Sequence, residues 1–218
     1  YFNYSQTYDR ILTNYWKNSD RGFLTMINSN SKLRDPMKFL ITVISSGKPP
    51  HLDCKKLLSE RLRAVEFFSR NSEIDLYGSG WDKCPPFPFW FFKKAVQKAY
   101  KGKAQSKYAT LSKYNFSICY ESCIFPGYIS EKIFDCLFVG TIPIYYGAPD
   151  IKEYIPKNCF IDMKDFKNYQ ELRKFLKSLT ESKIKTYKEN GRRFLESEQY
   201  RPFTKEYFAK IFVEACIS

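Results

Sequence analysis

The sequence predicts an α/β domain with a largely parallel sheet that is covered by helices on both faces. Segments typical of strands and of helices alternate from Gly22 to about Leu179, an order that favours a parallel sheet. Residues 120–149, YESCIFPGYISEKIFDCLFVGTIPIYYGAP, place a strand end, a turn, a helix and a further strand close together. The chain is 44% hydrophobic and 18% aromatic, which is sufficient for a buried core.

The beginning of the chain is predicted to belong to a different unit. Residues 1–21 are polar and aromatic, and we interpret them as the end of a preceding domain, with one strand at Arg10–Thr13. Gly22–Asn28 and Phe39–Ser45 are apolar, β-branched runs, and either one could be the first strand of the main domain. The main domain is predicted to cover residues 22–195.

A helix and a strand follow. Lys56–Arg70 is predicted to be helical because one face collects apolar side chains, namely Leu58, Leu62, Val65 and Phe68. Ile74–Tyr77 is predicted to be a strand that ends in the turn Gly78-Ser79-Gly80. No third glycine follows at dinucleotide-binding spacing, so this turn is a weak phosphate signal, and a simple strand-to-loop turn is the alternative.

The next elements place polar side chains at a helix start. Asn115–Tyr120 and Ile142–Tyr145 are predicted to be parallel strands, with a helix between them. Ser130 is the predicted N-cap of this helix, and Gly140 ends it. The first turn then lies at the carboxyl end of a strand, where phosphates and riboses bind in open α/β sheets.

Two amphipathic helices are predicted beyond the last strand, at Lys183–Leu195 and Thr204–Ala215. We treat residues 196–218 as a separate C-terminal helical segment.

The composition narrows the possible chemistry. A single histidine, His51, argues against a histidine-based metal site or a Ser–His triad, and the sequence contains no Asp-x-Asp pair for a metal-bound diphosphate.

Seven cysteines without a CxxC pair predict mostly buried, reduced thiols and hence a cytosolic setting. The expected location is cytoplasmic or peripheral at the cytoplasmic membrane, or the Golgi lumen if an anchor precedes Tyr1.

The net charge of +13 is unevenly distributed. Residues 83–113 contain eight lysines and no acidic residue, interleaved with prolines and aromatic residues. A solvated basic face is the simplest interpretation, and peripheral membrane contact is the second, because aromatic rings beside lysines suit a lipid interface. No RNA- or DNA-binding motif accompanies the charge, so nucleic acid is not an expected partner.

Five side chains are candidates for binding a nucleotide sugar at the helix start. Glu131 can accept two hydrogen bonds from ribose hydroxyls, although an acid that favours the helix dipole is the alternative. Lys132 opposes the dipole, so we expect it to meet an anion such as a diphosphate. Tyr128 could present its hydroxyl, with packing as the alternative. Glu121 could bond the nucleotide or brace the loop, and Ser122 is its polar neighbour.

The motifs YESC, YISEK and VGTIPIYYGAP resemble the donor-binding signature of the α1,3-fucosyltransferase family. The resemblance continues in the same order through Ser59–Asp82, Lys107–Glu121, Tyr154–Phe166 and Arg192–Thr204. One departure is that the family often reads Glu-Asn-Ser where this chain has Glu121, Ser122 and Cys123.

This resemblance implies a Rossmann-like sheet that forms the C-terminal, donor-binding half of a GT-B fold. It implies transfer of L-fucose from GDP-fucose to a glycan acceptor with inversion, without a metal or other cofactor. Its spacing from arginine to Gly78 favours Arg63 over Arg61 as a second diphosphate ligand beside Lys132. On a helical wheel Arg63 points away from the apolar face, whereas Arg61 lies within it and is expected to be a buried ion-pair partner. In the family the catalytic base lies on the N-terminal acceptor domain, so none is assigned here.

Three alternatives remain open at this point. A transferase of the same fold could use a different GDP-sugar, because no residue identifies fucose directly. The domain could also bind a nucleotide sugar without turnover, or act as a basic, aromatic surface-binding domain.

Overall fold

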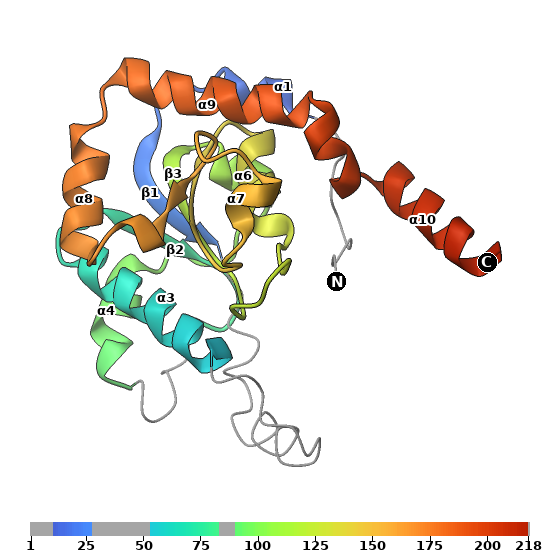
Figure 1. The fold of residues 1–218 in the computed structure, drawn as a ribbon. Helices are drawn as coiled ribbons and strands as arrows, with labels where there is room; N and C mark the ends of the chain where they lie inside the picture. Colours follow the sequence, from blue (N-terminus) through green and yellow to red (C-terminus); the bar gives the residue numbers. More distant parts are fainter. Residues whose placement is uncertain (1–10, 28–52, 83–89, 218) are drawn as a thin grey trace, which may run out of the picture.

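A computed structural model of the chain has a five-stranded, all-parallel sheet with helices on both faces (Figure 1). The structure describes residues 11–27, 53–82 and 90–217. The strand order is β2-β1-β3-β4-β5, and the bounds are β1 Gly22–Ile27, β2 Ile74–Tyr77, β3 Tyr114–Tyr120, β4 Ile142–Tyr146 and β5 Ile161–Asp162. The predicted α/β class is therefore confirmed.

The helices alternate with the strands along the sequence. Their bounds are α1 Thr13–Trp16, α3 Asp53–Ser69, η2 Trp90–Phe92, α4 Lys93–Ala99, α5 Lys107–Leu111, α6 Glu131–Phe138, α7 Ile151–Tyr154, η3 Met163–Asp165, α8 Tyr169–Ser178, α9 Glu181–Leu195, η4 Glu198–Phe203 and α10 Lys205–Ile217.

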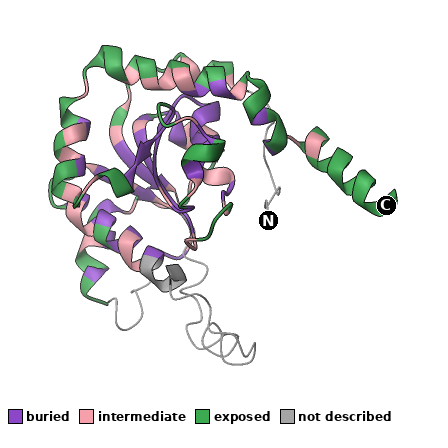
Figure 2. Cartoon of the chain, in the orientation of Figure 1, coloured by how far each residue is buried: buried purple, intermediate pink, exposed green. Residues whose placement is uncertain are grey.

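Two hydrophobic clusters form the core, one on each side of the sheet. The first packs α3, α4 and α8 against the strands through Leu62, Val96 and Leu172. The second is built around α6, whose Ile133 and Phe138 are fully buried. Figure 2 shows that the strands and α6 are almost entirely buried, whereas the outer faces of α8 and α9 are exposed.

Most predicted elements agree with the structure within a few residues. The predicted helices at Lys56–Arg70 and Lys183–Leu195 are observed at Asp53–Ser69 and Glu181–Leu195. The predicted run Phe39–Ser45 lies outside the described residues.

The predicted strand at Arg10–Thr13 is wrong where the structure describes it. Thr13 begins the short helix α1, and the backbone N–H of Leu12 donates to the carbonyl oxygen of Phe138 at the end of α6 (3.0 Å). The run therefore binds a helix end through the backbone of Leu12 instead of pairing with a neighbouring strand, so tertiary contact overrides its strand propensity.

The prediction of buried, reduced cysteines holds for three residues, holds in part for Cys216 and fails for Cys123. Cys119, Cys136 and Cys159 are buried free thiols, and Cys216 is an exposed one. Cys123, in the loop after β3, is disulfide-bonded. The argument from reduced thiols for a cytosolic setting therefore loses its support.

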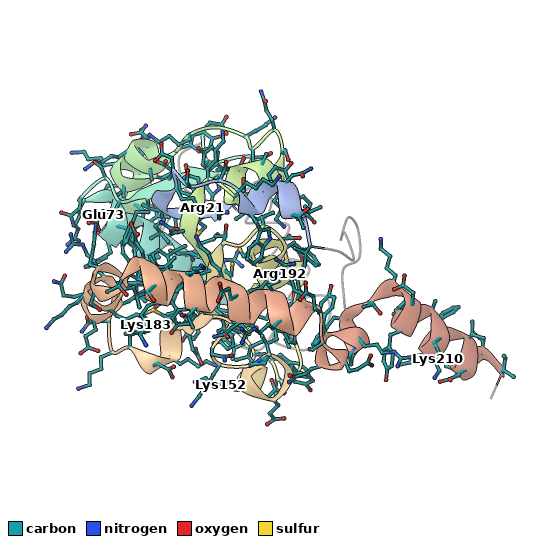
Figure 3. The ribbon with its side chains drawn as sticks, turned by 90° about the horizontal axis from the view of Figure 1, so that it is seen from above. Arg21, Glu73, Lys152, Lys183, Arg192 and Lys210 are labelled. Atoms are coloured by element: carbon teal, nitrogen blue, oxygen red, sulfur yellow. The ribbon has the colours of Figure 1, made fainter. Side chains whose placement is uncertain are left out.

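The C-terminal helix α10 extends away from the body of the domain (Figures 1 and 3). It has no buried residue, and it exposes large apolar side chains, including Phe208, Phe212 and Ile217. None of the helices that the structure describes is long and apolar enough to cross a bilayer.

Candidate nucleotide-sugar site

The candidate site lies where β3 ends and α6 begins, at the carboxyl edge of the sheet (Figure 1). Glu121 directly follows β3, and its backbone N–H donates to the carbonyl oxygen of Tyr146 at the end of β4 (2.8 Å). Ser130 occupies the N-cap position and Glu131 opens the helix, as the sequence predicts. The structure therefore brings polar residues of two segments together beside the ends of neighbouring strands.

The Glu121 carboxylate is the centre of the polar contacts in this site. It is fully buried, with 0% of its surface exposed. It accepts hydrogen bonds from the Ser130 backbone N–H at 2.8 Å and from the Ser130 hydroxyl at 2.6 Å. The Lys132 ammonium lies 3.2 Å from its Oε2 atom. A buried carboxylate needs such partners, so Glu121 in this geometry holds the start of α6 and does not face solvent.

Lys132 has an anionic partner within the protein, namely Glu121. The Lys132 Nζ atom also donates to the Ser130 hydroxyl oxygen at 2.8 Å. Its side chain keeps 18% of its surface exposed. An ammonium group has three N–H bonds, and these two contacts leave one for a ligand at the sheet edge.

Arg61 supports the same loop from α3. Its Nη2 atom donates to the backbone carbonyl oxygens of Tyr120 (2.7 Å) and Glu121 (2.6 Å). Burial lowers the pKa of the guanidinium, and the Glu121 carboxylate opposes that shift. The expected burial of Arg61 is confirmed, but its hydrogen-bond partners are carbonyl oxygens and not an acidic side chain.

Glu131 is held by charges from two helices. Burial disfavours its ionised form, but Lys132 and Lys107 outweigh this, so the pKa of Glu131 lies below its usual value. The Lys107 ammonium is 3.7 Å from the Glu131 carboxylate and also forms an ion pair with Asp135, one turn further along α6. The Tyr108 hydroxyl donates to Asp135 at 2.9 Å. Lys107 thus bridges two carboxylates that would otherwise repel each other.

The beginning of α6 has no side-chain cap. In α5, α8 and α9 the N-cap side chain accepts a hydrogen bond from a backbone N–H in the first turn; these N-cap residues are Ser106, Asn168 and Thr180. Ser130 makes no such bond: its hydroxyl donates to Glu121 and accepts from the Lys132 ammonium. The N-cap side chain therefore does not occupy the first-turn N–H groups of α6, which suits anion binding.

The loop that enters α6 is fixed by contacts to the β4–α7 segment. Gly127 adopts a φ of +70°, and both Asp150 carboxylate oxygens accept from its backbone N–H at 2.9 Å. Gly147 passes so close to Glu121 that an added Cβ would lie 2.5 Å from the Glu121 Cγ atom. Both glycines are therefore needed for this loop geometry.

The remaining predicted residues lie differently. Tyr128 is half-buried, and its carbonyl oxygen accepts from the Tyr145 hydroxyl at 3.4 Å. Ser122 is half-buried directly beside Glu121. Arg63 points outward on α3 with 61% of its side chain exposed, and it forms an ion pair with Glu60 at 2.7 Å. No contact joins Arg63 to the α6 start among the described residues, so its diphosphate role stays a prediction.

Two residues of the site were missed from the sequence. Lys107 and Asp135 sit in different segments, and neither follows a strand end, so their meeting depends on how α5 packs on α6. One signal was present: Asp135 interrupts the apolar run of α6 and is only 2% exposed, and a buried acid requires a cation.

Comparison with known proteins identifies the family. The family model described as glycosyltransferase family 10 (fucosyltransferase) C-term matches residues 50–216. The chain belongs to this family. It is 43% identical over 134 residues to alpha-(1,3)-fucosyltransferase B of Drosophila melanogaster, covering 60% of this chain and 29% of that protein. It is 27% identical over 192 residues to GDP-fucose protein O-fucosyltransferase 3 of Homo sapiens, and this match covers 82% of this chain and 36% of that protein.

The fold agrees with a solved member of the group. The structure of an alpha1,3-fucosyltransferase with GDP superposes with a TM-score of 0.53 and 22% identity, over 77% of this chain and 38% of that one. The family 10 domain described here therefore has the fold of part of that enzyme, as expected for one half of a GT-B protein. In each of these comparisons the chain spans well under half of the length of the protein that it matches.

Proposed function

We propose that this family 10 domain binds GDP-fucose as the donor half of a metal-independent, inverting fucosyltransferase that acts on a glycan. The observation that carries the proposal is the uncapped start of α6, with Lys132 and Glu131 on its first turn at the sheet edge. The family match across residues 50–216 supports the choice of substrate, as does GDP-fucose in the name of the human relative.

The chemistry assigns a separate role to each group. The helix dipole and the Lys132 ammonium would stabilise the diphosphate, which gains negative charge as the sugar leaves. The ionised Glu131 carboxylate would accept hydrogen bonds from ribose hydroxyls, and Lys107 would hold it in place. Arg63 would have to turn from Glu60 toward the ligand to act as a second phosphate ligand.

The catalytic base is proposed to lie outside this chain. An inverting transfer needs a group that removes the proton of the acceptor hydroxyl, and the two carboxylates at the start of α6, Glu121 and Glu131, are both held by lysines. A domain preceding residue 22 would supply the base and the acceptor site. We propose that α10 packs back on that domain, because it contains no buried residue and exposes Phe212, Val213 and Ile217.

The donor sugar and the turnover can be tested together. Titration calorimetry with GDP, GDP-fucose and GDP-mannose in EDTA should show binding of GDP and a preference for GDP-fucose. A requirement for Mg²⁺ or Mn²⁺ would contradict metal independence, and a preference for GDP-mannose would support a different GDP-sugar. Transfer assays on glycans containing N-acetylglucosamine should show no product from residues 1–218 alone; product would place a base within this chain.

A further inference from the structure

We propose that the start of α4 docks on an anionic lipid bilayer through an aromatic–lysine surface, which consists of Trp90, Phe91, Lys93, Lys94 and Lys98. This surface takes no part in the site at α6, and the inference is independent of the proposed donor. It rests on the exposure of two large rings, on the charge beside them and on the orientation of the rings.

The two rings are exposed although the same helical turn contributes to the core. Trp90 and Phe91 are each 61% exposed, whereas the next residue, Phe92, is only 4% exposed and packs with Val96 and Ala99. Phe92 fixes η2 on the domain, so its neighbours are held outward on an ordered element. Tryptophan and phenylalanine in such a position suit the boundary between headgroups and acyl chains.

All the charged residues of α4 are lysines. Lys93 and Lys94 follow the rings at helical spacing, and neither has an acidic partner among the described residues. Within the described part of the chain, Lys98 donates to the backbone carbonyl oxygen of Arg70 (2.9 Å) and to no acidic side chain. Lysines close to a bilayer are attracted by anionic headgroups, so charge and apolar surface favour the same partner.

The ring geometry favours a bilayer over nucleic acid. The planes of Trp90 and Phe91 are 77° apart, with centroids separated by 6.5 Å. Successive bases of a single strand stack face-on upon aromatic rings, which two nearly perpendicular rings cannot both offer. Insertion into a lipid interface has no such requirement.

A second exposed apolar surface lacks the charge. Helix α10 exposes Phe208 and Phe212, but its charges are mixed, and Lys210 lies 3.7 Å from Glu214. It therefore provides a matched control: apolar exposure without a cationic surface.

The chain contains its own probe for the experiment. It has three tryptophans; Trp81 is 2% exposed and Trp16 is half-buried, so Trp90 is the most exposed. Vesicles of phosphatidylcholine with and without phosphatidylserine, carrying brominated acyl chains, should be mixed with the chain. We expect quenching of tryptophan emission on the phosphatidylserine vesicles alone, and loss of that quenching in Trp90→Phe with binding retained.

Vesicle sedimentation tests the lysines. Lys93→Glu/Lys94→Glu should lower vesicle partitioning by at least about 25-fold, since each lysine near the surface contributes about fivefold. The control variant Lys183→Glu/Lys185→Glu on α9 changes the net charge by the same amount and should lower vesicle partitioning much less. Figure 3 shows Lys183 on that helix. Phe208→Ala/Phe212→Ala should leave partitioning unchanged.

Three results would overturn the proposal. Equal losses for the two lysine pairs would show that binding follows only net charge. Loss of binding in the α10 variant would assign the contact to α10. Binding without quenching of Trp90 would show that the rings do not enter the interface.

Discussion

The two ends of α6 are built in opposite ways. At the C-terminal end the last carbonyl groups are satisfied by the chain itself: Phe138 accepts from the Trp16 indole N–H at 2.9 Å, and the Arg21 guanidinium donates to Val139 (3.2 Å) and Gly140 (2.9 Å). At the N-terminal end the N-cap side chain, Ser130, bonds none of the first N–H groups, and charged residues are held beside them.

The difference separates a structural end from a binding end. A cation at a helix C-terminus stabilises the dipole, so Arg21 stabilises α6 and closes it. At the other end Lys132 opposes the dipole and is kept there by the buried Glu121 carboxylate. An arrangement that stabilises a cation and leaves N–H groups uncapped is ready for an anion. Substitutions at the two ends should therefore have different consequences.

The largest effect is expected at Glu121. Glu121→Gln removes the charge that balances Lys132 and weakens the hydrogen bonds to Ser130. The free energy of unfolding should therefore fall by about 3–5 kcal/mol, the loss expected when one partner of a buried ion pair is removed. Urea unfolding measures this, with the exposed Glu153→Gln on α7 as the control. A loss no larger than that of the control would show that Glu121 does not hold the start of α6.

The two glycines next to α6 offer a sharper comparison. In Gly147→Ala the new Cβ would lie 2.5 Å from Glu121, and in Gly140→Ala it would lie 2.9 Å from Trp16 at a φ of +68°. Each substitution should destabilise the fold by about 1–3 kcal/mol through overpacking or strain. Only Gly147→Ala should also weaken GDP binding in calorimetry. Equal loss of GDP affinity in both variants would contradict the separation of the two ends.

Arg21 and Lys107 provide a pair of cations from the two ends. Arg21→Ala should lower stability by about 1.5–3 kcal/mol, because charged hydrogen bonds to helix carbonyls are lost, and should leave GDP affinity unchanged. Lys107→Ala should weaken GDP binding by freeing Glu131, and Lys107→Arg should restore it in part. Parallel thermal unfolding and GDP titration distinguish the two effects. Unchanged GDP affinity in Lys107→Ala would remove Lys107 from a positioning role.

The smallest effect is expected in the pH dependence of stability, through Lys188. The Lys188 ammonium donates to the Asn115 side chain at 2.9 Å and lies near Arg21. Burial, with a contribution from Arg21, lowers its pKa to about 8. The unfolded chain, with a lysine pKa of about 10.4, then binds more protons than the folded one between these values. Stability should therefore rise with pH from about 8 to about 10, by about 1 kcal/mol after allowance for partial exposure. Lys188→Met should remove this rise; its persistence would exclude Lys188 as the source.

Much of the binding end could be predicted from the sequence because its features are local. Ser130 and Glu131 follow the rules of helix starts, and the strand before them fixes their place at the sheet edge. The closed end could not be predicted, because Arg21 and Trp16 are more than 110 residues away from the carbonyl groups they bind. The sequence showed these two residues only as part of a polar and aromatic segment.

The roles of the two arginines on α3 show the same limit. The periodicity of the helix predicted that Arg61 is buried and Arg63 exposed, and both are. The periodicity gave no information on what a buried arginine contacts. Every residue has a backbone carbonyl oxygen, and the sequence does not show which of them accept a hydrogen bond. The disulfide at Cys123 was missed for a related reason, because pairing between distant cysteines depends on the fold.

The central claim is that the start of α6 binds a diphosphate, and Lys132 tests it most directly. GDP and guanosine should be titrated into the chain and into Lys132→Ala, with thermal unfolding confirming that the variant is folded. Loss of a charged hydrogen bond of about 1.5–3 kcal/mol predicts that GDP affinity falls by about 10- to 150-fold while guanosine binding stays the same. Equal weakening of both ligands, or unchanged GDP affinity in the folded variant, would contradict the claim.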